Sequence, residues 1–413
     1  MISCNFGPAV DTPEMIELLR GSFADNAVVQ LALLVAHGLQ APGYFYKSYL
    51  QSLPKHYTTP LYWSKSDFDL IENPITRHNA INSVRAAMML FIRSVKTLAR
   101  AKRIIKITSK SARANPLIMN NISWDLFRWS MSVVMTRQNY IPYVDLMTNE
   151  TKESHTLIPM WDMMNHEEGK MTTLFDPEID GLEYRAMRAF EEGSEVTMHY
   201  GNRSNEQLII YSGFVSNSAN SSDDFIIALN TNIPDEFSKI RNNILGKYAQ
   251  LVAPRRSYDV LRAGGMFSLL VRRSDVAICL SDGLFAGLVA VASKEELGSV
   301  MRLTEEYIND ITIGNSRSVE KILNFMEHGK FSKDFVIRGL KWIDGQASKY
   351  LDEMIEKDYG QASSVHLGSS IRLMNQGHKQ MVQLFQSFLH ETSSKIASVM
   401  VAEDKVAVVD GIK

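Results

Sequence analysis

Residues Leu157–His166 read Leu-Ile-Pro-Met-Trp-Asp-Met-Met-Asn-His, and this stretch decides how the rest of the chain is interpreted. Its apolar start predicts a short buried strand, and Asn165–His166 places two polar side chains directly after that strand. An isolated Asn-His pair is most often a turn. Here two further polar elements flank it, Met135–Asn139 upstream and Tyr200–Asn205 downstream. Polar residues that converge on one short β region are typical of a binding site.

Upstream of this region the pattern is helical. Between residues 25 and 113, apolar residues recur at helical spacing and predict helix faces that pack into a core. The second of these faces consists of Val84, Met88, Phe91, Val95 and Leu98, and the adjacent Met89 is also interpreted as core. The basic run Lys102–Arg113 is interpreted as a solvated helix end and is given no role. A further helix is predicted from Ser123, and Ile141–Pro142 is expected to break the chain after it.

Downstream, short strands are predicted at 157–160, 182–187 and 195–200. The Ser- and Asn-rich stretch 216–222 cannot pack and is interpreted as a domain boundary. Beyond Asp223 the chain is predicted to be almost wholly helical, and the end from Glu403 to Lys413 is expected to fray.

The amino-acid composition of the chain excludes several functional classes. Lys and Arg number 44 against 46 Asp and Glu, so the chain has no general basic footprint and no nucleic-acid partner is expected. Two distant cysteines cannot build a disulfide framework or a zinc cluster. The apolar runs are too short to cross a bilayer and no secretory signal is present, so we expect no membrane partner and a cytoplasmic protein, with the nucleus as a second compartment.

The Asn165–His166 pair after one strand and the Tyr200–Gly201 pair that ends another resemble the two C-terminal motifs of the SET methyltransferase domain. Within that family, Tyr49–Pro54, Thr59–Trp63 and the polar elements above resemble the actin-histidine methyltransferase branch. The resemblance implies an α+β fold in residues 1–215, a SET-type β knot with a helical insertion at about 25–130 and the C-terminal SET motifs at 131–215. It implies an all-α substrate-binding domain at 223–400, similar to that of plant Rubisco lysine methyltransferases, and a tail at 401–413.

The resemblance also implies roles for individual residues, and it implies no metal. The residues expected to hold S-adenosylmethionine are Arg137, Asp162, Met163, Met164, Asn165 and His166, with Ser212, Gly213 and Phe214 against the adenine. The residues expected on the substrate side are Asn139, Trp161, Tyr200 and Arg203, of which Asn139 and Tyr200 are the catalytic pair.

The chemistry of methyl transfer suits these residue types. Displacement at a sulfonium needs alignment more than acid–base assistance, and imidazole is already mostly neutral at pH 7. If the Asn139 side-chain oxygen accepts the imidazole Nδ1–H, the lone pair remains on Nε2. Trp161 would form a flat wall beside the ring, and the Tyr200 hydroxyl would steer the methyl group through weak C–H···O contacts.

The start of the chain departs from the family pattern. A Gly-x-Gly turn normally cradles the methionine end of the cofactor, but residues 1–8 contain only Gly7, so we expect the N-terminal part of the SET domain to be missing before Met1. Three functions stay open. The leading hypothesis is a monomeric protein-histidine N-methyltransferase acting on actin, and the alternatives are a catalytically silent actin-binding protein and a protein-lysine methyltransferase.

Overall fold

The computed structural model describes residues 2–3, 23, 26–108, 122–145, 150–171, 173–176, 181–217, 220–230, 233–252, 266–301, 331–355 and 357–410. The chain forms two compact units, one of Met1–Asn220 with Asp358–Met374 and one of Ser221–Lys357 with Asn375–Lys413. Gly7 and the end of the basic run, Lys110 and Arg113, lie outside the described residues. No described helix is both long enough and apolar enough to cross a membrane.

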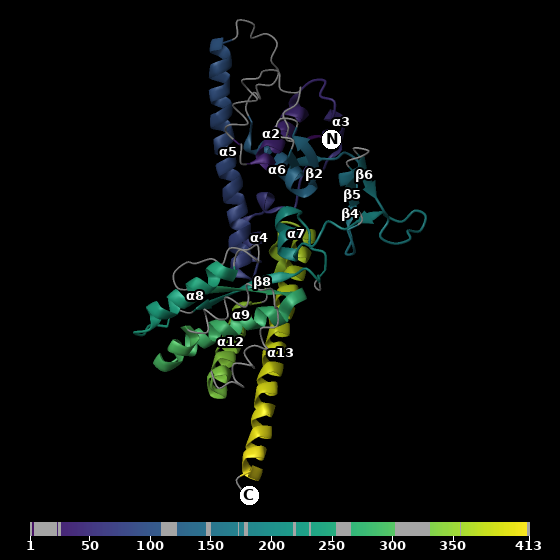
Figure 1. The fold of residues 1–413 in the computed structure, drawn as a ribbon. Helices are drawn as coiled ribbons and strands as arrows, with labels where there is room; N and C mark the ends of the chain where they lie inside the picture. Colours follow the sequence, from purple (N-terminus) through teal and green to yellow (C-terminus); the bar gives the residue numbers. More distant parts are fainter. Residues whose placement is uncertain are drawn as a thin grey trace. The chain divides into compact units, whose positions relative to one another are not determined.

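Helices dominate the first half of the first unit (Figure 1). They are α2 (Ala27–Gln40), α3 (Lys47–Ser52), the 3-10 helix η1 (Pro60–Tyr62), α4 (Lys65–Asp69), α5 (Pro74–Thr108) and α6 (Trp124–Arg137). Side-chain caps start α2, α6 and α4, since Asn26 accepts from the Val29 N–H at 3.0 Å, Ser123 accepts from the Leu126 N–H at 3.2 Å, and Ser64 forms a capping box at α4. Helix α2 packs against α6, with Val35 and Phe127 fully buried between the helices of this core.

The predicted core face of α5 is only partly correct. Leu98 is buried, and Val84 and Phe91 pack partly buried against the core, but Met88, Met89 and Val95 are exposed by 49, 67 and 40%. The face that packs inward instead carries the small residues Ala80, Ala87 and Ser94. Small residues at intervals of seven let the helix lie close to its neighbours, which leaves the larger apolar side chains outside.

The described strands of the first unit pair into three small sheets. The first has the order β1 (Ile2–Ser3), β3 (Glu150–Leu157), β2 (Asn139–Asp145), all antiparallel. Pro142 therefore lies inside a strand and does not break the chain as expected, because β2 is an edge strand, where a missing N–H costs no ladder bond. Strands β5 (Thr173–Asp176) and β6 (Gly181–Tyr184) form an antiparallel pair.

The parallel pair of β4 (Asn165–His166) and β7 (Thr197–Met198) builds the site described below. It joins two segments about thirty residues apart and places His166 opposite Met198. Helix α7 (Asn205–Tyr211) follows, started by a capping box between Ser204 and Gln207. Gly213 then adopts a φ of +80°, and a Cβ there would lie 2.5 Å from the Thr58 hydroxyl oxygen, so this position requires glycine.

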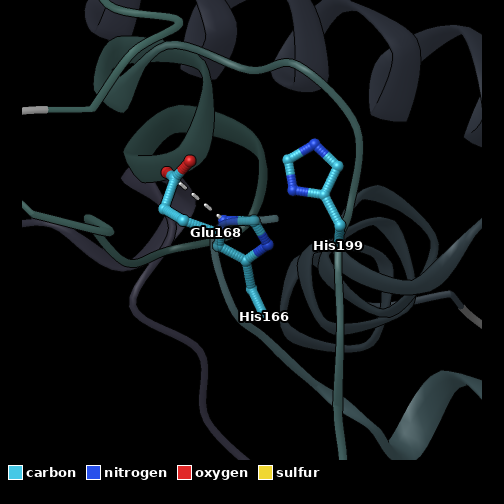
Figure 2. A group of neighbouring side chains, drawn as sticks. All are labelled: His166, Glu168 and His199. Carbon is cyan, nitrogen blue, oxygen red and sulfur yellow. Dashed lines mark ion pairs between the residues drawn. The ribbon is translucent and has the colours of Figure 1, made fainter. Parts of the chain in front are cut away.

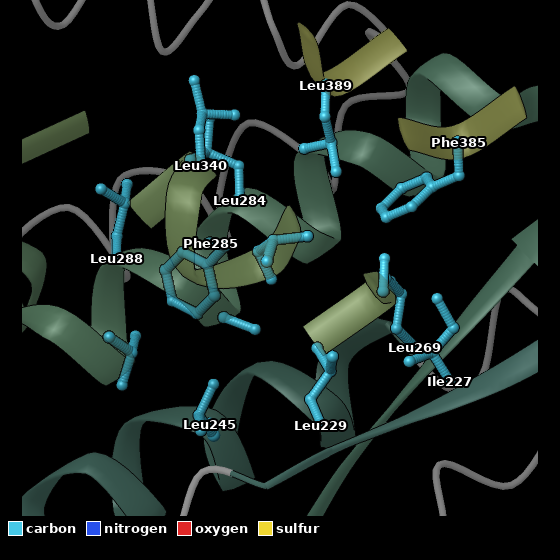
Figure 3. Packing of buried hydrophobic residues seen from close by; sticks show 14 of the residues in the cluster. Ile227, Leu229, Leu245, Leu269, Leu284, Phe285, Leu288, Leu340, Phe385 and Leu389 are labelled. Carbon is cyan, nitrogen blue, oxygen red and sulfur yellow. The ribbon is translucent and has the colours of Figure 1, made fainter. Parts of the chain in front are cut away.

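The second unit is not all helical, contrary to the expectation for 223–400. Strands β8 (Asp224–Asn230) and β9 (Met266–Arg272) form an antiparallel pair, packed with α8 (Ser238–Val252), α9 (Val276–Val291) and α12 (Lys333–Glu353). Short apolar runs do not distinguish a buried strand from a helix, which explains the error. Figure 3 shows Ile227 and Leu269 of the strands facing Phe385 of α13 (Val365–Asp410) in this core.

In the second unit, helices α9 and α12 pack closely, and α13 is the last helix of the chain that the structure describes. A Cβ on Gly287 of α9 would lie 2.5 Å from the Gly339 carbonyl oxygen of α12, so the two helices touch through backbone. Helix α13 continues to Asp410, into the stretch expected to fray, and residues 411–413 and 302–330 lie outside the described part.

Candidate active site

A cavity of about 330 Å³ lies in the first unit, where the end of α6, the start of β2, the 3-10 helix η2 (Trp161–Met163) and the chain after β7 meet. Of the residues predicted for the site, those that line it are Arg137, Asn139, Trp161, Asp162, Met164, Tyr200 and Arg203. The sequence thus predicted a set of residues, spread over more than sixty positions, that the fold brings to one cavity.

The other predicted residues do not line the cavity. Met163 contacts Arg137 through its sulfur at 3.7 Å, and Asn165 is exposed and donates to Glu195 at 2.5 Å. His166 lies behind Tyr200, with ring centroids 5.2 Å apart, and its ring is 5.8 Å from that of Phe214. Ser212 and Gly213 follow α7, where Thr58 donates to the Gly213 carbonyl oxygen at 2.5 Å. His166 and Phe214 thus back the cavity wall.

Arg137 and Asp162 form one polar corner of the cavity. Arg137 donates to the Asp162 backbone oxygen at 2.5 Å, and its guanidinium lies 4.0 Å from the carboxylate. The Tyr49 hydroxyl donates to the same carboxylate. Burial raises the pKa of Asp162, while the Tyr49 hydrogen bond and the Arg137 charge oppose that rise. Burial and the neighbouring carboxylate raise the pKa of Tyr49, so its hydroxyl keeps its proton and remains a donor.

Asn139 stands at the start of β2 with its amide orientation set by the backbone. Its Nδ2 donates to the Arg137 carbonyl oxygen at 3.2 Å. This orientation leaves Oδ1 as the end of the amide that can accept a proton donor in the cavity.

Trp161 enters the cavity from a strained turn. Met160, immediately before it, has a φ of +74°, the single positive value among the described non-glycine residues. Such a backbone costs about 1–3 kcal/mol and is retained where the surrounding structure imposes it. The Trp161 ring meets the Tyr184 ring edge-on, with centroids 6.4 Å apart, which fixes the plane of the indole.

Tyr200 is held at both ends. Its hydroxyl donates to the Met164 carbonyl oxygen at 2.6 Å, and its backbone N–H donates to Nδ1 of His166 at 3.2 Å. Burial raises the pKa of Tyr200 above its ordinary value, so the phenol remains neutral and its oxygen keeps lone pairs toward the cavity. Arg203 lines the same wall, and burial lowers the pKa of its guanidinium.

Solved structures with this architecture are SET domains. The SET domain of LSMT bound to lysine and AdoHcy superposes with a TM-score of 0.60 over 96% of this chain and 80% of that chain, at 12% identity. Rubisco LSMT bound to AdoMet gives a TM-score of 0.56 at 13% identity, with the same coverage. The chain has the SET-domain fold. The prediction of an α+β SET architecture is confirmed.

Sequence comparison finds curated relatives that share half of the chain. No family model matches the chain. Over 208 residues, half of the chain, it is 31% identical to the actin-histidine N-methyltransferase of Rattus norvegicus and 30% identical to that of Homo sapiens. The match covers 32% of each relative, so it spans about a third of the length of these curated relatives.

His166, Glu168 and His199 form a cluster in which His199 also lines the cavity (Figure 2). Nε2 of His166 is 3.7 Å from the Glu168 carboxylate, and the possible ligand atoms of the three residues lie within 4.8 Å of one another. Because Nδ1 of His166 accepts the Tyr200 N–H, the proton of the neutral ring resides on Nε2, the atom that would face a metal ion. Burial lowers the pKa of His166, the Glu168 carboxylate opposes that shift, and the neighbouring His199 adds to it.

Sequence reasoning missed several residues of the site. Tyr49 was part of a recognised motif but received no role, and its contact with Asp162 spans 113 positions. The cavity is also lined by Gln138 and Tyr140, which flank Asn139, and by Met171 and Thr173, which precede or begin β5. Adjacency to Asn139 was an available signal for the first two. No sequence pattern indicated the other residues.

Proposed function

We propose that this chain carries out S-adenosylmethionine-dependent protein-histidine N-methylation, with a histidine of actin as the methyl acceptor. The observation that supports this most is the meeting of Asn139, Trp161 and Tyr200 in one cavity, as an acceptor amide, a flat apolar wall and a fixed phenol oxygen. The relatives that share half of the chain are named actin-histidine N-methyltransferases, which supports the same choice.

Unsatisfied buried polar atoms suit the proposed cofactor. Nε of Arg137 and Oδ1 of Asp162, both at the cavity, are buried and have no hydrogen-bond partner among the described residues. Leaving such atoms unpaired costs about 1–3 kcal/mol each, so a polar ligand that pairs them would be stabilised. The solved SET neighbours bind AdoMet, AdoHcy or sinefungin, and we propose that Arg137 and Asp162, which line the cavity, hold the equivalent molecule here. When bound, that molecule would supply a methyl group on a sulfonium.

In the proposed reaction the chain aligns a neutral imidazole. Oδ1 of Asn139 accepts the imidazole Nδ1–H, which leaves the nucleophilic lone pair on Nε2. Trp161 lies along the ring face and excludes water, and its orientation is fixed by Tyr184. The Tyr200 oxygen, anchored on Met164, contacts the transferring methyl group weakly and limits its direction. The proton is lost from the methylated ring to solvent after transfer.

Lysine methylation is a second candidate, because the SET domain of LSMT was solved with lysine and that structure shares the fold. The two candidates differ at the nucleophile, since a lysine with a pKa near 10.4 must lose a proton first. A cavity with an amide acceptor and an indole wall favours a planar, already neutral ring.

Incubation of this chain with unmethylated actin and S-adenosylmethionine, followed by peptide mass spectrometry, tests the proposal. We expect an added methyl group on a histidine, lost in Asn139→Leu and retained in the matched Asn243→Leu at an exposed position of α8. A methyl group on lysine would favour the second candidate. No methyl group, with actin still bound, would indicate a catalytically silent actin-binding protein.

A further inference from the structure

Helix α5 presents an exposed face that its core packing does not use. Ala80, Ala87 and Ser94 turn inward, and Met88, Met89, Ile92 and Val95 are exposed on the other side. Isolated apolar residues on a surface need no explanation, but four within two turns of one helix form a continuous stripe.

Cations share this face. Arg85, Arg93, Lys96 and Arg100 are exposed on the same side as the apolar stripe, over about 22 Å of helix. The 35-residue helix contains eight Lys and Arg residues and no Asp or Glu, although the whole chain is slightly acidic. The stripe and these four cations are called the α5 face below.

The chemistry of the α5 face favours one kind of occupant. A second copy would bring cations against cations, so self-association through this face is opposed by its charge. Nucleic acid would pair the cations but leave the apolar stripe unused. Membrane-surface helices use Trp, Phe and Leu on their apolar side, whereas methionine is favoured at adaptable protein-binding surfaces. An acidic protein surface with apolar side chains pairs both components.

The α5 face is rigidly linked to the cavity within the first unit. Phe91 lies on the inner side of α5, and its ring centroid is 5.5 Å from those of both Trp124 and Phe127 of α6. Helix α6 ends at Arg137, which lines the cavity. A protein held on the α5 face would therefore be held by the same body that carries the site.

We infer that the α5 face is a docking surface for the folded protein substrate, through an acidic and partly apolar patch of that substrate. The inference rests on the proposed function, because the bound protein is the methyl acceptor. Docking outside the cavity raises the effective concentration of the target side chain without contacting it. It predicts that folded substrate is preferred over a short peptide with the same histidine.

The test compares steady-state kinetics on folded actin and on a short actin peptide spanning the methylated histidine. The variant Arg85→Glu/Lys96→Glu/Arg100→Glu reverses the charge of the face, and the matched variant Lys55→Glu/Lys65→Glu/Lys341→Glu makes the same charge change at exposed lysines elsewhere. We expect the KM for folded actin to rise about tenfold in the first variant only, as three exposed ion pairs allow. The kcat and the KM for the peptide should stay unchanged in both.

A second variant removes the apolar component alone. Met88→Ser/Met89→Ser should also raise the KM for folded actin, while near-ultraviolet circular dichroism confirms that both variants are folded. The inference is wrong if the KM for folded actin is unchanged in the variants, or if the KM for the peptide rises equally. It is also wrong if the native chain binds phosphatidylserine vesicles and the variants lose that binding while their KM for folded actin stays unchanged. Absence of methylation by the native chain on either substrate would instead refute the proposed function.

Discussion

The hydrogen bond from Tyr49 to Asp162 offers a sharp test of how the site is held. Asp162 is only 9% exposed, and its Oδ1 has no hydrogen-bond partner among the described residues, so the Tyr49 hydroxyl is its main neutralising contact besides Arg137. A hydrogen bond to a charged group contributes about 1.5–3 kcal/mol. We therefore expect Tyr49→Phe to lower the free energy of unfolding of the first unit by about 2 kcal/mol at pH 7, or roughly 4–8 °C in Tm.

The loss of unfolding free energy in Tyr49→Phe should depend on pH. Burial already raises the folded-state pKa of Asp162 above its ordinary 3.8, and removing the hydroxyl raises it further. In the pH range between 3.8 and the folded pKa, the folded state binds more protons than the unfolded state, so stability falls as pH rises. The destabilisation by Tyr49→Phe should therefore be largest at neutral pH and shrink in acid, where the carboxyl group is protonated in both proteins.

Thermal unfolding at pH 7 and in mild acid, followed by circular dichroism, measures this effect. Tyr211→Phe is the matched control, because Tyr211 is exposed and removal of its hydroxyl should leave Tm unchanged. In an Asp162→Asn background the Tyr49→Phe effect should fall well below its value in the native chain, since the charge is gone. Equal losses in the two tyrosine variants, or a loss independent of pH, would refute the reasoning.

Three further predictions concern backbone, specificity and acid stability. Gly213→Ala should lower Tm, because the φ of Gly213 is +80° and the new methyl group would clash with the Thr58 hydroxyl. Gly298→Ala is the control and should raise Tm, because Gly298 lies in open space on a helix. Equal shifts in Tm would contradict this steric explanation. The double variant Trp161→Ala with Asn139→Phe should lower histidine methylation and admit lysine, and mass spectrometry showing unchanged histidine methylation would reject the proposed roles. Burial lowers the pKa of His378 to about 4, so the second unit should lose stability as pH falls from 6.5 toward 4, and His378→Gln should flatten that slope in thermal unfolding.

Local sequence determined much of the candidate site. The sequence predicted a strand at 157–160, but β3 ends at Leu157 and the 3-10 helix η2 follows. Asn165 and His166 themselves form β4, and Tyr200 follows β7. Arg137 and Asn139 were singled out by the resemblance, and the structure places them at the end of α6 and the start of β2, a strand that the sequence analysis did not predict. The short motifs were visible in the sequence, but the roles of their residues were implied by the resemblance to the SET family and not by propensity or spacing.

Tertiary structure alone decided which distant residues meet. The parallel pairing of β4 with β7 brings Tyr200 to His166. Parallel strands are not joined by a tight turn, so no turn motif in the sequence indicates that these two strands pair. The contact of Tyr49 with Asp162 likewise depends on how the helices pack on the sheet. For the same reason, the sequence did not show which face of α5 is exposed. Periodicity shows that a helix has two faces, but only the close approach permitted by Ala80 and Ala87 decides that the small residues pack inward and the methionines meet solvent.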